Sequence, residues 1–125
     1  MFSHVMIGVN DMEASKKFYD ATMQVLGYKP GVMDEKGRCF YFDKSGVFAL
    51  TKPIDGEPAC HGNGSTLGFK VESTEQAEAW HAAGIANGGV ACEDPPGLRG
   101  EGEKERQLAY LRAATGNKIC TLLRV

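Results

Sequence analysis

The chain has 125 residues, of which 42% are hydrophobic and 24% are charged, and its formal net charge is −2. This length predicts a single domain, and the near-neutral charge gives no field that would favour nucleic acid or an anionic membrane. The first residues lack the basic start and long apolar run of a signal peptide. Four cysteines without C-x-x-C spacing predict reduced thiols rather than disulfides. We therefore expect a soluble, cytoplasmic protein with no nucleic-acid or membrane partner.

Residues 3–27 predict a strand, a capped helix and a turn. Residues 4–9 form a compact apolar run that is rich in β-branched side chains, which is typical of a strand. Asp11 is suited to cap the helix, because its carboxylate can accept hydrogen bonds from the free N–H groups of the first turn. Ala14, Phe18 and Val25 then recur at helical spacing, and Gly27 stands where a glycine ends a helix.

The same order of features recurs 62 residues later, where Val9 aligns with Val71 and Gly27 with Gly89. The second copy begins with its own capping signature, Ser73-x-x-Gln76. The strand, the helix cap and the terminating glycine thus recur in the same order with one constant spacing. This series indicates an internal duplication of a βα unit.

Three strands are expected after the first helix, and the second half is expected to repeat this order. The expected strands are residues 28–33, 38–43, 47–51, 65–71, 90–93, 107–113 and 118–124, and the second helix is residues 73–87. Residues 94–103 are expected to be an irregular loop, because they are rich in proline, glycine and charge. The predicted single domain thus has module 1 at 1–52, a linker at 53–64 and module 2 at 65–125. We expect an α+β fold of two βαβββ modules, whose sheets each cover one face with a helix and curl around a cleft.

Several short motifs follow one another along nearly the whole chain. They are SHVMIGVNDMEAS, LGY, GNGSTLGFKV, AEAWHAAGIANGG, PPGLRG and AYLRAATGNKICTLL. In this order they resemble the vicinal oxygen chelate superfamily, which includes glyoxalase I, extradiol dioxygenases and bleomycin-resistance proteins. The resemblance implies a glyoxalase-like fold with mixed sheets. It also implies a homodimer, because members of the superfamily commonly pair modules across a two-fold axis.

In this superfamily a divalent metal is held by side chains on the first and last strands of each module. The metal chelates two adjacent substrate oxygens and stabilises an enolate or oxyanion as a Lewis acid. The resemblance transfers the four metal-proximal places to His4, Ala49, Thr66 and Cys120. Only His4 is a usual ligand, since alanine has no donor atom, threonine is a weak donor and the cysteine replaces a carboxylate. We therefore expect no metal in the family manner and no cofactor, with a divalent metal on replacement ligands as the alternative.

The expected ligand-binding cleft also includes Tyr41, Arg99 and Tyr110. Arg99 offers a bidentate fork for a substrate carboxylate, although it can equally be a solvated loop arginine. Cys120 is either a small buried hydrophobe or a thiolate activated by His4. His4 itself is either an acid/base in the cleft or a strand-end histidine with a local hydrogen bond.

Three functions are compatible with these residues, and no catalytic residue can be assigned among them. The favoured function is metal-free binding of a small organic molecule in the cleft between the modules. The second is a metal-dependent enzyme, either a glyoxalase I-like lyase or an extradiol dioxygenase-like enzyme. The third is a metal-free enzyme that uses His4 and Cys120.

Overall fold

The computed structural model describes residues 1–124 and, at residue 104, the backbone. The first half of the chain contains β1 (His4–Gly8), α1 (Met12–Val25), β2 (Val32–Met33), β3 (Cys39–Asp43) and β4 (Gly46–Thr51). The second half contains β5 (Leu67–Lys70), α2 (Thr74–Ala86), β6 (Val90–Ala91), β7 (Gly97–Arg99), η1 (Gly102–Lys104), β8 (Arg106–Arg112) and β9 (Lys118–Arg124). Among the described residues, no helix is long and apolar enough to cross a bilayer.

Each half forms its own mixed sheet, with strand order β1-β4-β3-β2 in the first and β5-β9-β8-β6 in the second. In both sheets the first strand is parallel to the last strand of its half, and the other pairs are antiparallel. The two sheets therefore have equivalent topology. The predicted α+β class with two βαβββ units is confirmed.

The second sheet contains one strand that the sequence analysis assigned to a loop. β7 lies within residues 94–103 and pairs antiparallel with β8, where Leu98 is opposite Gln107. β6 pairs only with Leu111 and Arg112 of β8, so the other end of this long strand still offers backbone hydrogen-bonding groups. β7 satisfies these groups, which are costly to leave unpaired.

Both helices begin at the predicted caps. Asp11 Oδ1 accepts a hydrogen bond from Ala14 N at 3.0 Å, and Ser73 Oγ accepts one from Gln76 N at 3.0 Å. The Gln76 side chain accepts from Glu72 N, one residue before the cap. Its Nε2 also donates to the carbonyl of Val25 at 3.0 Å, so the second cap is tied to the end of α1.

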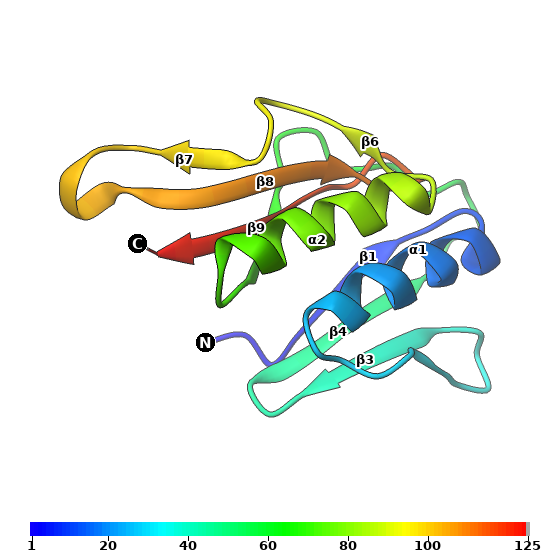
Figure 1. Cartoon of the computed structure of the whole chain (residues 1–125). Helices are drawn as coiled ribbons and strands as arrows, with labels where there is room; N and C mark the ends of the chain where they lie inside the picture. The colour runs from blue at the N-terminus through cyan, green and yellow to red at the C-terminus, as the bar shows by residue number, and fades with distance from the viewer. Residues whose placement is uncertain (125) are drawn as a thin grey trace.

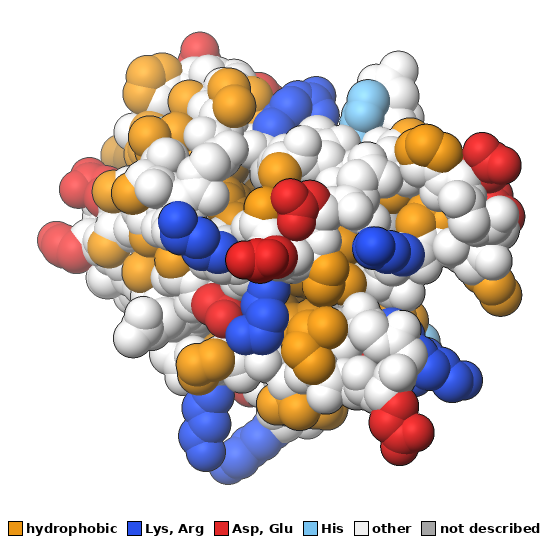
Figure 2. Space-filling model, turned by 90° about the vertical axis from the view of Figure 1, so that its right-hand side faces the viewer, with side chains coloured by type: hydrophobic (Ala, Val, Ile, Leu, Met, Phe, Trp, Pro, Cys, Tyr) orange, Lys and Arg blue, Asp and Glu red, His pale blue; other side chains and the backbone are white. Residues whose placement is uncertain are grey.

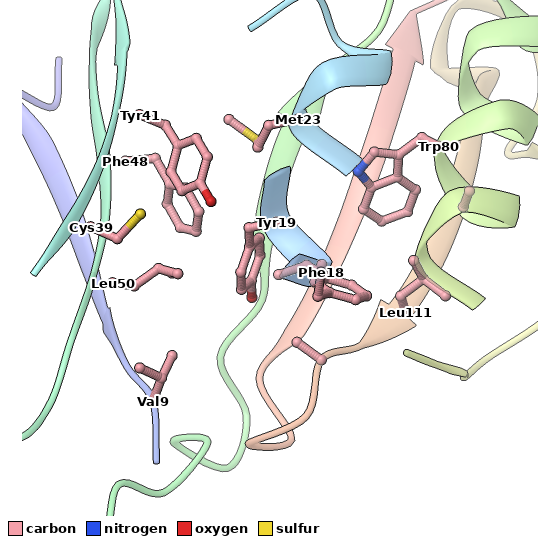
Figure 3. Packing of buried hydrophobic residues seen from close by; sticks show 13 residues of the cluster. Val9, Phe18, Tyr19, Met23, Cys39, Tyr41, Phe48, Leu50, Trp80 and Leu111 are labelled. Atoms are coloured by element: carbon pink, nitrogen blue, oxygen red, sulfur yellow. The ribbon is translucent and has the colours of Figure 1, made fainter. Parts of the chain in front are cut away.

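The two helices lie antiparallel and side by side, with one sheet packed beside each (Figure 1). Side chains from α1 and from the helix-facing sides of both sheets meet in one core. In Figure 3, Phe18 and Tyr19 of α1 lie between Phe48 and Leu50 on one side and Trp80 and Leu111 on the other. The rings of Phe48 and Phe69 are 5.3 Å apart and join the modules directly. The helix-facing sides of both sheets therefore face a common interior.

Each sheet consequently turns its other side outward. We call the outer side of the β1-β4-β3-β2 sheet the first open face; it includes His4, Met6, Phe40, Phe42, Val47 and Ala49. The outer side of the other sheet is the second open face; it includes Lys70, Arg99, Tyr110, Arg112, Lys118 and Cys120. The side of the molecule shown in Figure 2, turned by 90° from Figure 1, mixes acidic, basic and apolar side chains. The described side chains there form no patch of purely positive or purely negative charge.

Candidate functional site

The first open face holds two of the residues at the family's metal positions. In the ladder of β1 and β4, His4 is opposite Val47 and Met6 is opposite Ala49. His4 Nδ1 lies 2.8 Å from Ser3 Oγ, which is the local hydrogen bond expected of a strand-end histidine. The pocket beside His4 is lined by residues 1–5 and 45–47, all of which belong to the first module.

The rest of the first open face is apolar and aromatic. Phe40 and Phe42 stack with ring centroids 6.1 Å apart, and Arg38 lies over the Phe40 ring at 5.3 Å. Met6 is 37% exposed and Phe42 is 60% exposed. A contiguous apolar surface that remains exposed is typical of a binding or pairing surface.

Tyr41 lies on the other side of β3, in the core. It is 2% exposed, and its hydroxyl donates to Asp20 Oδ1 at 2.8 Å. Burial and this hydrogen bond strongly raise the pKa of the Tyr41 phenol. Tyr41 was expected in the ligand-binding cleft but faces the core, and because side chains alternate along a strand, Phe40 and Phe42 occupy the first open face instead.

The second open face brings Tyr110 and Cys120 together. They are paired residues of β8 and β9, and Lys118 Nζ lies 5.0 Å from the centre of the Tyr110 ring. Lys118 also forms an ion pair with Glu93. Burial raises the pKa of the Cys120 thiol more than the nearby Lys118 lowers it. Cys120 is therefore a protonated thiol at neutral pH, not an activated thiolate.

Arg99 lies at the edge of the same face. Its Nη2 donates to the carbonyls of Asp94 at 3.0 Å and Pro95 at 2.9 Å, which hold the side chain back along β7. The guanidinium thus lies over Gly97, where an added Cβ would be 3.4 Å from Nη1. Gly97 is opposite Leu108 of β8, and the charge of Arg99 acts on Tyr110. Burial raises the pKa of that tyrosine, and Arg99 partly opposes the shift.

Thr66 and the linker close one end of the second open face. A pocket there is lined by residues 61–66 together with Arg112 and Lys118. Exposed His61 is part of this pocket, whereas His81 on α2 is partly buried, and burial lowers its pKa. The second open face thus unites Thr66, Arg99, Tyr110 and Cys120.

The candidate residues are therefore divided between two surfaces that point in different directions. His4 and Ala49 belong to the first open face, Thr66, Arg99, Tyr110 and Cys120 belong to the second, and Tyr41 lies in the core. Four further residues lie on these faces without having been predicted as site residues: Met6, Phe40, Arg112 and Lys118. The two-residue period of the strands would have placed Arg112 and Lys118 beside Tyr110 and Cys120.

The donor set does not fit the family's metal within one chain. Among residues 1–124, no group of three or more His, Cys, Asp or Glu side chains could hold a metal ion. His4 and Cys120 lie on different sheets, and Ala49 has no donor atom. A catalytic zinc site typically has about three protein ligands, and a single imidazole provides one.

The comparison with known families agrees with the fold. The model of the glyoxalase/bleomycin resistance protein/dioxygenase superfamily matches residues 1–121. The chain belongs to this superfamily. The resemblance found in the sequence is thereby confirmed, while no curated protein sequence matches the chain.

Solved structures of the superfamily include one similar chain and several distant ones. A glyoxalase/bleomycin resistance protein from Albidiferax ferrireducens T118 is 60% identical, with a TM-score of 0.92 over 97% of each chain. A family enzyme from Burkholderia phytofirmans PsJN is 17% identical, with a TM-score of 0.73 over 98% of each chain. A glyoxalase-related enzyme from Fulvimarina pelagi is 17% identical, with a TM-score of 0.72 over 98% of this chain and 86% of that one. The two structures that are 17% identical show only that the fold is shared.

Proposed function

We propose that this superfamily member binds a small organic molecule between two copies of the chain. In the proposed pair, the first open face of each copy lies opposite the second open face of the other. The observation that carries the proposal is the division of the candidate residues between two outward surfaces. A cleft that contains both groups needs a second chain, and an isologous two-fold pair would create two equal clefts.

The chemistry of the two faces supports this pairing. The first face exposes Met6 and Phe42, which a lone chain would leave in water. The second face carries arginine, lysine and tyrosine side chains around Leu108, which is 8% exposed. Ligand sites commonly combine an apolar wall with a few polar groups that orient the ligand.

The proposal assigns neither a divalent metal nor a nucleophilic thiol to the site. His4 is the one usual metal ligand at the four family positions. Cys120 is protonated at neutral pH, because burial raises its pKa, whereas a nucleophilic cysteine needs a lowered pKa. Binding without turnover is thus the function that these residues support best.

The test combines a mass measurement with a search for bound molecules. Light scattering at micromolar concentration should give the mass of two chains, and native mass spectrometry should detect a small molecule retained by that particle. Met6→Asp should abolish this retention by placing a carboxylate in the apolar wall. Ile54→Asp is the matched control, because Ile54 is fully exposed in the linker. A monomer by light scattering would overturn the proposal.

A further inference from the structure

The second open face carries an excess of positive charge. Arg99, Arg112 and Lys118 all project from it. Arg112 donates to the carbonyl of Gly116 at 2.7 Å, and Arg99 donates to two other carbonyls. Carbonyl oxygens orient a guanidinium without neutralising its charge. On this face Glu93 pairs with Lys118, and Glu72 lies 3.9 Å from Lys70.

Arg99 is already positioned for a ligand. Two carbonyls hold its Nη2, and the absence of a side chain at Gly97 gives the guanidinium room on the surface. Arg99 therefore attracts an anion through its positive charge, because Nη2, which belongs to both two-pronged edges of the guanidinium, is already held by the two carbonyls. The Tyr110 hydroxyl is a second donor, because burial raises its pKa and keeps it protonated.

The proposed opposite wall differs in character. Phe40 and Phe42 stack with an interplanar angle of 15°, and Met6 and Val47 extend this aromatic and apolar wall. Such a wall favours planar apolar rings. Resting on the pairing proposed above, we infer that the cleft binds a planar organic oxyanion, with its ring on the aromatic wall and its anionic group at Arg99 and Tyr110.

The charge of the ligand is tested with one ring system. Isothermal titration should compare 1-naphthoate, 1-naphthylmethanol and 1-naphthylmethylammonium on the wild-type protein. We expect the carboxylate to bind at least about tenfold more tightly than the alcohol, since charged hydrogen bonds are roughly twice as strong as neutral ones. 1-Naphthyl phosphate distinguishes a phosphate ligand from a carboxylate ligand. Equal binding of the alcohol and the carboxylate would overturn the inference.

The role of Arg99 is tested by substitution. Arg99→Gln should weaken binding of 1-naphthoate by about tenfold and leave binding of 1-naphthylmethanol unchanged. Arg99→Lys keeps the charge and should give an intermediate loss. Lys17→Gln is the matched control, because it removes the same charge from an exposed position on α1. A loss that is equal for acid and alcohol would mean that Arg99 only supports the loop, and it would overturn its role as the anion site.

A mixing experiment separates failure of the ligand class from failure of the pairing. Met6→Asp chains and Arg99→Gln chains each have one damaged face. When they are mixed and allowed to exchange, random pairing should restore about one cleft in four to wild-type affinity. No restoration from two exchanging dimers would overturn the shared cleft. A dimer that binds none of the naphthyl anions would overturn the ligand class and leave the pairing in place.

Discussion

Gly84 marks the tightest approach between α2 and the second sheet. A Cβ at this position would be 2.2 Å from Leu111 Cδ1 and 3.3 Å from Phe18 Cε2. Leu111 is 0% exposed and Phe18 is 1% exposed, so neither has free space to enter. Gly84→Ala would gain about 1 kcal/mol of helix propensity, whereas overpacking a closed core costs about 1–3 kcal/mol. We expect a net destabilisation of about 1 kcal/mol.

The effect of Gly84→Ala on the free energy of unfolding should change sign when Leu111 is shortened. Leu111→Ala alone should cost about 2–5 kcal/mol, because it removes buried atoms and leaves a cavity. In that background the added methyl group no longer meets Leu111, and it fills part of the cavity. Gly84→Ala should then stabilise the protein by about 1 kcal/mol, which gives a coupling energy of about 2 kcal/mol between the two positions.

The assay is urea unfolding followed by circular dichroism for the wild type, both single variants and the double variant. Protein concentration must be equal throughout, because a pairing equilibrium would change the apparent stability. Changes in the midpoint at constant m report the free energy of unfolding. If Gly84→Ala stabilises the wild type as much as it stabilises the Leu111→Ala chain, the reasoning about close packing is refuted.

Three further predictions follow from side chains with defined surroundings. Burial alone would raise the pKa of Asp20, but three hydrogen bonds outweigh it and lower the pKa; Asp20→Asn should therefore cost about 1 kcal/mol in unfolding at pH 7. That difference should shrink below about pH 4 as the wild-type carboxylate is protonated, and a pH-independent difference would contradict this account. A thiol reagent should modify exposed Cys60 long before buried Cys120, as peptide mass mapping would show; equal rates would contradict the burial of Cys120. Protein purified without chelator should contain less than one divalent metal per chain by elemental analysis, and stoichiometric metal that His4→Ala removes would show a family-type site.

The local elements of the fold could be predicted because their causes are local. The side chain of Asp11 caps a residue only three positions away, and Ser73 does the same for the second helix. The terminating glycines Gly27 and Gly88 need only a positive φ, which glycine adopts without a steric penalty. The repeated order of these signals indicated two βαβββ modules, and the series of short motifs along the chain carried the resemblance to the superfamily.

The direction of a side chain could be predicted only where apolar and polar residues repeat with a clear period along the strand or helix. Tyr110 and Cys120, which were expected in one cleft, are paired on one face of their sheet. The aromatic run of β3 had apolar residues at successive positions, so its pattern did not show which of them faces the core. On α1 the buried side includes Ser15 and Tyr19, whereas Ala14 is exposed, and the Tyr19 ring packs on Phe48 of β4.

The sequence by itself determined the two modules, their caps and the residue types available at the family's ligand positions. Tertiary structure alone decided that β7 pairs with β8, that Tyr41 is buried against Asp20, and that the two open faces point in different directions. These outcomes depend on partners that are distant in the sequence, such as Phe48 against Phe69. The helices pack against each other and bury the inner sides of both sheets in one core, so the orientation of the candidate site follows from this long-range packing and not from any local pattern.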